Sequence, residues 1–215
     1  MVPNGGSTAC DNPSDEWGWG VGAGLTLKMP WDAKDTLSGV IAYSKGAVGF
    51  VAYGNSASNF IHKQGVAFGA DVDGVFATGT GIELTEAWGG TLAFEHYWTP
   101  SLRTSFVGAY LNVSYTDAAK AMMAATGAGT CTASGFTAVT NCNPDYSLWR
   151  VSSRTMWNPV RNLDVGVEVA YSQLDTAFGG TANVAGANGL AAGNYAIENQ
   201  GYWTAAFRVQ RNFWP

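Results

Sequence analysis

The chain has 215 residues, a formal net charge of −5 at pH 7 and only 13% charged side chains. Its 11 Lys and Arg form no basic run, which argues against a nucleic-acid partner. Its 9 Trp, 9 Tyr and 10 Phe argue against disorder, and no window offers the ~20 consecutive apolar residues that a transmembrane helix needs.

We expect residues 1–16 to form an irregular segment. Its opening part, Met1–Cys10, has no charged start, no apolar stretch and no cleavage site, so it does not read as a signal peptide. No apolar run precedes Cys10, so this cysteine is not a lipoprotein acylation site. Either a signal peptide has been removed or the upstream part of a longer protein is missing; we favour the second, and the missing part would be able to supply a partner for Cys10.

Apolar and polar residues alternate along a β domain that we place at 17–215, and this alternation predicts about nine strands. In the first of them, Trp, Val, Ala and Leu side chains share one face and glycines fill most of the other. The expected strands are Trp17–Lys28, Thr36–Ser44, Gly46–Tyr53, Val66–Asp73, Ile82–Trp98, Leu102–Thr116, Tyr146–Trp157, Leu163–Gln173 and Trp203–Pro215.

The faces of two central strands can be assigned from this alternation. In 82–98, we expect Trp88, Leu92, Phe94 and Trp98 to lie on one side. In 102–116, we expect Val107, Ala109, Leu111 and Val113 to face outward.

Connections of unequal length separate these strands. Short turns are expected at 99–101 and 158–162, and long loops at 117–145 and 176–199. Short turns at one end and long loops at the other are typical of transmembrane β-barrels. Together with the ten-residue alternation and the aromatic strand ends, they predict an all-β, antiparallel transmembrane β-barrel or a portion of one.

Three segments resemble the general porins of alphaproteobacteria, of the rhizobial and brucella type. They are Trp98-Thr-Pro-Ser-Leu-Arg103-Thr-Ser, Trp157-Asn-Pro-Val-Arg161-Asn-Leu-Asp164 and Phe207-Arg-Val-Gln-Arg211-Asn-Phe213. The resemblance runs from about residue 17 to the end and corresponds to the C-terminal half of such a porin. It implies part of a 16-stranded barrel, a homotrimer, and a C-terminal signal at Phe213 for the outer-membrane assembly machinery. The constriction loop is then expected in the other half.

The expected function is a porin of the bacterial outer membrane, a passive diffusion channel for small hydrophilic solutes and ions in contact with lipid. Two alternatives stay open: a secreted, Trp-rich β-sandwich that binds carbohydrate like a lectin, and a structural barrel that does not conduct. We expect no enzyme activity, no metal and no cofactor. His62 and His96 have no nucleophile at a recognisable spacing, and His96 fits an interfacial position.

The hairpin at 146–173 carries the most informative charges. A turn centred on Val160 pairs Ser152 with Glu168 and places Glu168 diagonally between Arg150 and Arg154. The polar face of this hairpin is either a charged patch on the pore wall that biases ion selectivity or an internal ion cluster that stiffens the wall. Further pore-lining candidates are Arg208, Lys28, Glu95, Asp71 and Asp73.

Two further sets of residues suggest roles outside the pore. Cys131 and Cys142 are expected to form a disulfide within the 117–145 loop, and they do not match zinc-ligand spacing. Aromatic side chains near the strand ends are expected at the depth of the lipid headgroups. These aromatic residues are Trp17, Trp19, Tyr97, Trp98, Tyr115, Trp157, Tyr171, Trp203 and Trp214.

Overall fold

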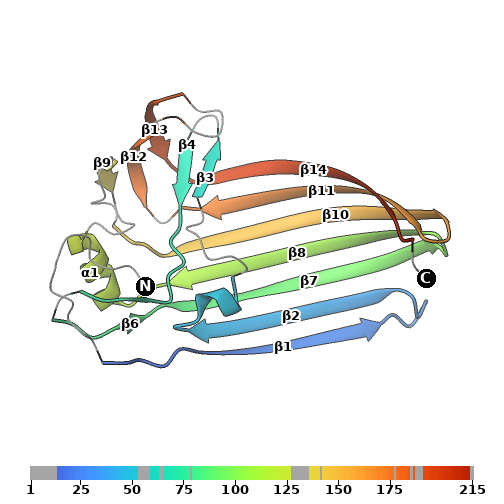
Figure 1. Cartoon of the computed structure of the whole chain (residues 1–215), viewed down its shortest axis with the longest axis horizontal. Coiled ribbons are helices and arrows are strands. Elements are labelled where there is room, and N and C mark those ends of the chain that lie inside the picture. The colour runs from blue at the N-terminus through green and yellow to red at the C-terminus, as the bar shows by residue number, and fades with distance from the viewer. Residues whose placement is uncertain are drawn as a thin grey trace.

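The computed structural model describes residues 14–52, 59–62, 65–77, 79–126, 136–140, 142–176, 178–184, 186 and 191–213. They form one long sheet and, at one end of it, a group of short strands with a helix (Figure 1). The expected all-β, mostly antiparallel architecture is confirmed. Among the described residues, no helix is both long and apolar enough to cross a bilayer.

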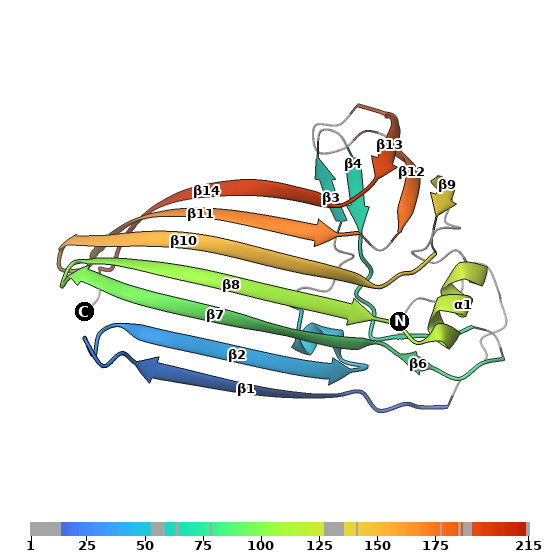
Figure 2. The same cartoon turned by 180° about the vertical axis from the view of Figure 1, so that it is seen from behind.

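Seven strands make the long sheet, and every neighbouring pair in it is antiparallel. The strands β1 and β14 are its two edges, and the sheet is open between them (Figures 1 and 2). In spatial order the strands are β1 (Trp19–Lys28), β2 (Thr36–Lys45), β7 (Glu86–Thr99), β8 (Leu102–Ser114), β10 (Tyr146–Val160), β11 (Leu163–Asp175) and β14 (Gln200–Arg211).

The two ends of the long sheet differ. At the turn end, short connections at 29–35, 100–101 and 161–162 join the strands in pairs. At the connection end lie the remaining elements (Figure 2). They are η1 (Val48–Phe50), β3 (Asn59–His62), β4 (Gly65–Phe68), β5 (Gly74–Val75), β6 (Glu83–Leu84), α1 (Asp117–Thr126), β9 (Phe136–Thr140), β12 (Gly179–Val184) and β13 (Gly193–Ile197).

Regular structure occupies part of both segments expected as long loops. The segment 117–145 contains α1 and β9, and 176–199 contains β12 and β13. The strand predicted at Gly46–Tyr53 is wrong. Gly46 has a φ of +70° and ends β2, after which the chain forms the 3-10 helix η1. Of the strand predicted at 66–73, only residues 66–68 belong to a strand, the C-terminal part of β4.

The strand register separates the sheet into two faces, because directly paired residues of an antiparallel sheet share a face. One row of paired residues is Lys28, Thr36, Glu95, Ser105, Arg154, Glu168 and Ala206, and we call its side the inner face. The adjacent row is Leu27, Leu37, Phe94, Phe106, Ser153, Val169 and Ala205, on the outer face. The two rows differ in chemistry although they are one residue apart.

The facing predicted for the strand at 102–116 is wrong. Phe106 and Tyr110 are exposed on the outer face, whereas Val107 lies on the inner face and Val113 is fully buried there. The apolar side chain of Val113 misled the prediction because Val113 lies at the connection end of β8, where the short strands and α1 cover the inner face. There it belongs to a protein core and does not face outward.

That core is small and lies at the connection end, between the inner face of the long sheet and the elements packed on it. The 3-10 helix η1 folds over the inner face, where a Cβ added at Gly20 would lie 2.7 Å from the ring of Phe50. The buried core residues are Val48, Ala52, Ala67, Val75, Ala87, Val113, Tyr115, Ala119, Met123, Tyr146, Leu174, Phe178, Ala182 and Ile197.

Candidate functional site

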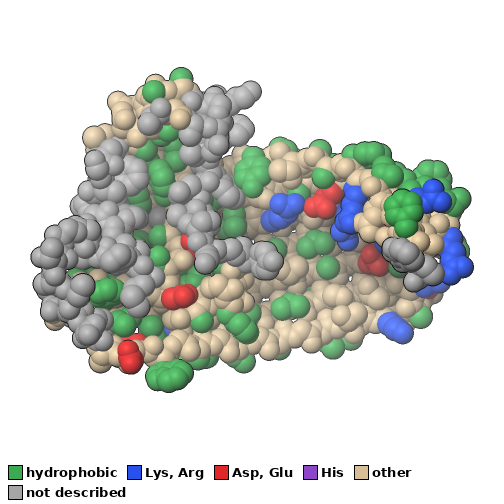
Figure 3. Space-filling model, viewed as in Figure 1, with side chains coloured by type: hydrophobic (Ala, Val, Ile, Leu, Met, Phe, Trp, Pro, Cys, Tyr) green, Lys and Arg blue, Asp and Glu red, His purple; other side chains and the backbone are tan. Residues whose placement is uncertain are grey.

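The inner face of the long sheet carries most of the charged side chains of its seven strands. In Figure 3, basic and acidic side chains gather in the hollow of the sheet, on the side turned toward the viewer. By register, the charged residues of the seven strands that lie on this face are Lys28, Glu95, Arg103, Arg150, Arg154, Asp164, Glu168 and Arg208. This face is the candidate functional site.

Arg150, Arg154 and Glu168 meet on β10 and β11, though in a different register from the predicted one. Glu168 pairs directly with Arg154, two residues away from its predicted partner Ser152. Nη2 of Arg150 lies 3.1 Å from Oε1 of Glu168, so the diagonal ion pair forms. The cause of the shift is the turn, because the ladder is irregular between residues 157 and 160 and the left-handed residue is Asn162, with a φ of +67°.

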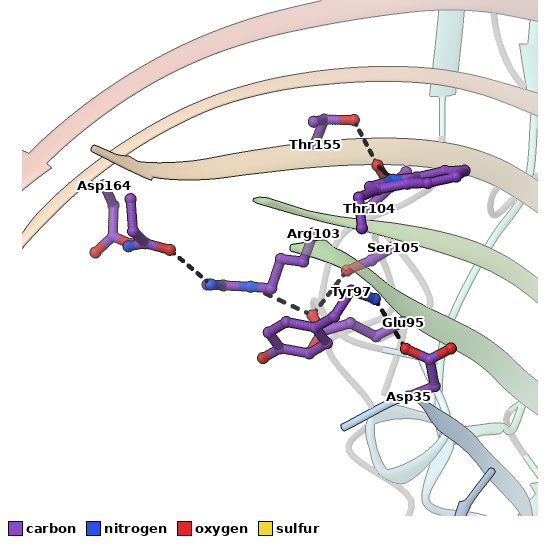
Figure 4. A network of polar contacts seen from close by, with 10 residues as sticks. Asp35, Glu95, Tyr97, Arg103, Thr104, Ser105, Thr155 and Asp164 are labelled. Atoms are coloured by element: carbon purple, nitrogen blue, oxygen red, sulfur yellow. Dashed lines mark hydrogen bonds and ion pairs between the residues drawn. The ribbon is translucent and has the colours of Figure 1, made fainter. Parts of the chain in front are cut away.

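A second polar network joins β7, β8 and the turn end (Figure 4). Nε of Arg103 lies 3.6 Å from Oε2 of Glu95, and Oγ of Ser105 donates to the same oxygen at 3.0 Å. Nη1 of Arg103 donates to Oδ1 of Asn158 at 3.0 Å, and Nδ2 of Asn158 donates to Asp164. These contacts connect the β7–β8 and β10–β11 hairpins across the inner face.

Sequence reasoning missed Arg103, Asp164 and Tyr97 as members of this face. Tyr97, expected among the lipid headgroups, lies on the inner face, with the Arg103 guanidinium 6.0 Å from the centre of its ring. The signal was present in Arg103 itself. Arg103 and Val107 are four residues apart in one strand, so their side chains lie on the same face. An outward Val107 would therefore place Arg103 on the lipid side as well, where an arginine is destabilising.

Three basic side chains of the inner face have no acidic partner within 4 Å among the described residues. Lys28 is exposed at the turn end of β1, and Arg154 is exposed in the middle of β10. Arg208 donates to the amide oxygen of Gln210. The inner face therefore holds basic groups whose charge the neighbouring strands leave uncompensated.

The remaining predicted site residues lie away from the strand wall. Oδ1 of Asp73 accepts the backbone N–H of Val48 at 2.7 Å and so holds η1. Asp71 lies half-buried in the same connection, where burial raises the pKa of its carboxyl above the ordinary value. Cys142 takes part in a disulfide, but Cys131 lies outside the described residues, as does Cys10, so the pairing of Cys142 stays a prediction.

A buried carboxylate marks the turn end of the outer face. Asp35 is fully buried and accepts hydrogen bonds from the backbone N–H of Tyr97 at 2.8 Å and from Nε1 of Trp31 at 2.8 Å. Nδ1 of His96 lies 2.6 Å from its Oδ2. The Tyr97 N–H, foremost, and the two side chains hold the pKa of Asp35 below its usual range. His96 thus has a structural partner.

Aromatic side chains cross the outer face in a row near the connection end, one from each strand of the long sheet. Neighbouring rings contact one another, with centroids 5.3 Å apart for Trp19 and Tyr43 and 5.1 Å apart for Tyr171 and Trp203. The connection-side row comprises Trp19, Tyr43, Trp88, Tyr110, Trp149, Tyr171 and Trp203. The exposed aromatic side chains at the turn end are Trp31, Trp98, Trp157 and Phe213, and we call them the turn-side row. Tyr115, expected among such residues, is instead buried in the core.

Between these two rows, the outer face of the seven strands carries no Asp, Glu, Lys or Arg except Arg211, whose guanidinium lies 5.8 Å from the centre of the Phe213 ring at the turn-side border. Its large side chains are exposed, among them Leu25 at 64% and Phe207 at 70%. Three of its polar groups form a chain: Nε1 of Trp98 donates to Thr104 at 2.9 Å, and the hydroxyls of Thr104 and Thr155 lie 3.0 Å apart (Figure 4). This surface suits an apolar solvent.

No protein-family model matches the chain, and no curated protein matches its sequence. Among solved structures, the fold is similar to the crystal structure of the outer membrane channel DcaP of Acinetobacter baumannii, with a TM-score of 0.47 and 16% sequence identity. The similarity covers 89% of this chain and 41% of the chain of that channel, so this chain spans less than half the length of that protein. The likeness concerns the arrangement of strands alone.

Proposed function

We propose that the chain forms the wall of a channel in the bacterial outer membrane, through which small hydrophilic solutes and ions diffuse passively. One observation carries the proposal: the same seven strands present on one face an apolar band between two aromatic rows, with Arg211 at its border as the one charged strand residue, and on the other face a polar, charged surface. Transmembrane β-barrels have this arrangement because one face contacts lipid and the other water.

The dimensions of the apolar band support a membrane location. Trp88 and Trp98 belong to the two aromatic rows and are ten residues apart on β7. At ~3.4 Å per residue the rows are about 34 Å apart along the strand, and a tilt of roughly 35–45° reduces this to about 24–28 Å of height. The apolar band of outer-membrane barrels is ~25 Å tall. Rows of Trp and Tyr at its borders suit the headgroup layers.

The lectin-like sandwich fits the structure less well. A sandwich buries its apolar faces between two packed sheets. Here the apolar face of the long sheet is the exposed one, and the described short strands pack instead at one end of its inner face. A structural barrel that does not conduct would share the outer face, so only transport separates it from a channel.

Three partners follow from the proposed membrane location. Outer-membrane lipid would contact the band between the aromatic rows. Phe213, which is 80% exposed just beyond β14, would be available to the assembly machinery as part of a C-terminal signal. Association as a homotrimer is the third proposal, carried by the family resemblance alone.

Reconstitution into planar lipid bilayers tests the proposed function. The refolded chain should require detergent or lipid to stay in solution and should give stable, ohmic current steps. A chain that remains soluble and monomeric without detergent would contradict the membrane location. A chain that inserts, shown by protection of its strands from protease, but carries no current would contradict the channel and favour the structural barrel.

A further inference from the structure

The basic residues of the inner face lie at successive depths of the proposed membrane wall. Depth can be counted along each strand from its aromatic residue in the connection-side row toward the turn end. Arg150 is one residue away from that row, Arg154 and Arg208 are five, Arg103 is seven and Lys28 is nine. We call these five residues the basic ladder. Its steps of two to four residues correspond to about 7–14 Å along a strand.

Acidic residues compensate only part of this ladder. Glu168 contacts Arg150, and Glu95 contacts Arg103. Asp164, the third acidic residue on the inner face of the strands, accepts a hydrogen bond from the side-chain amide of Asn158. Five bases against three acids leave the inner face with an excess of two positive charges, in a chain whose formal net charge is −5.

The acidic residues that make the whole chain negative lie largely at the connection end, and several of them have partners there. Asp145 binds Lys120 at 2.7 Å, Glu83 accepts the hydroxyl of Thr116 at 2.7 Å, and Asp73 accepts the N–H of Val48. They are therefore separated along the wall from the positive excess near the middle and the turn end. A solute that enters from the connection end passes from acidic surroundings to basic ones.

The bases without an acidic partner keep their donors for a solute. The side chain of Arg154 makes no hydrogen bond or ion pair with any described residue, although Arg154 is the strand partner of Glu168. A guanidinium presents planar, paired N–H donors that match carboxylate and phosphate oxygens. An ion cluster that served only to stiffen the wall would have its charges paired within the cluster, as Arg150 and Glu168 are.

From these observations we propose that the basic ladder makes the channel selective for anions, in particular small solutes that carry a carboxylate or a phosphate. This inference rests on the proposed channel function and specifies its substrate class. Transport through a channel requires binding that is favourable enough for entry and weak enough for release, usually at several sites in series. Single guanidinium and ammonium groups at successive depths provide such a series.

The zero-current potential of the refolded full chain across a gradient of dilute KCl tests the proposal. The wild-type channel should be anion-selective. Arg154→Gln/Arg208→Gln should lower the anion-to-cation permeability ratio by roughly 16-fold, since Coulomb's law in water gives about a twofold fall in local anion concentration and about a twofold rise in local cation concentration for each unit charge removed at ~10 Å. The KCl concentrations on the two sides should be near 0.01 M, where the screening length is ~30 Å.

Matched variants separate this effect from damage to the fold. Arg211→Gln removes the same charge from the same strand, but at an outer-face position at the turn-side border of the apolar band, and should leave selectivity unchanged. Arg154→Lys/Arg208→Lys keeps the charge and should keep the anion preference. Inorganic phosphate should reduce the chloride current of the wild type more strongly than that of Arg154→Gln/Arg208→Gln.

The outcomes distinguish the two proposals. A wild-type channel that conducts but prefers cations, or a double Gln variant with wild-type selectivity, would overturn the anion ladder and leave the channel function intact. An inserted chain without current would overturn both. The anion ladder is supported only if conduction, anion preference and its loss in the double Gln variant occur together.

Discussion

The outer and inner faces of the long sheet are built from the same strands, yet they follow opposite rules. Leu27 and Lys28 are neighbours in the chain, and their rows cross all seven strands side by side. The row of Leu27 is apolar except for Ser153, whereas the row of Lys28 contains four charged residues. Because a strand alternates its side chains, one residue of displacement changes the surroundings from proposed lipid to water. The sheet therefore acts as a boundary between two solvents.

An arginine placed on either face gives the largest expected contrast. Leu92 and Thr91 are adjacent on β7, near the middle of the apolar band and on opposite faces. Leu92→Arg should lower the free energy of unfolding in lipid vesicles by ~2–4 kcal/mol, the cost of a lipid-facing arginine near the midplane. Thr91→Arg should change it little, because the inner face is wet. Urea titration of both variants measures the difference, and equal effects would mean that the faces are not distinct.

Removal of one ring from the connection-side row should have a smaller effect. Trp203 is 71% exposed and contacts the ring of Tyr171. Trp203→Ala should lower the free energy of unfolding in vesicles by roughly 0.5–1.5 kcal/mol through the lost ring contact, with a further loss from the headgroup layer. Thr204→Ala, the next residue on the inner face, is the control. A Trp203 variant as stable as this control would argue against an interfacial row.

The ion pair between Arg150 and Glu168 should contribute still less to stability. Its side chains are 43% and 32% exposed, so water screens their attraction. A double-mutant cycle of Arg150→Gln and Glu168→Gln should give a coupling energy of roughly 0.2–1 kcal/mol. A coupling several times larger would identify this pair as a stiffening element of the wall.

The last expected effect is a loss of stability that appears only at acidic pH. It concerns Asp35, the buried carboxylate at the border of the outer face. Because folding lowers its pKa, ionised Asp35 stabilises the fold fully above its ordinary value of 3.8. That contribution is lost as the pH falls through the lowered pKa of the folded state. Unfolding in detergent between about pH 6 and pH 2 should show this loss in the wild type. Asp35→Asn should show a shallower dependence on pH, and an unchanged profile would exclude this role of Asp35.

Strands could be predicted where one face is clearly apolar and the other clearly polar. The segment that became β14 alternates without ambiguity, and its Trp203 and Phe207 lie on the outer face as the pattern indicates. In β8 both faces contain apolar residues, so alternation alone does not show which face is the outer one. The charged Arg103 decides this, because only one of the two orientations keeps its side chain away from lipid.

Other features depend on contacts that no local pattern contains. We expected a hairpin turn centred on Val160, but the turn lies at 161–162, and therefore Arg154 rather than Ser152 pairs with Glu168. At the connection end, β4 and β13 pair in parallel through Val66 and Ile197, which lie far apart in the sequence. Such pairings depend on the packing of several short elements together, and no periodicity marks them in advance.

The connection-side aromatic row also gives the tilt of the strands. Three of its six steps between strands follow direct pairs, as from Tyr171 to Trp203. The other three, such as Trp149 to Tyr171, move two residues toward the turn end. The average stagger is one residue per strand, and ~3.3 Å along a strand for every ~4.8 Å across it is an inclination of about 35°. If the row marks one depth in the bilayer, solutes pass along a wall of oblique strands, and the basic side chains follow a slanting course around it.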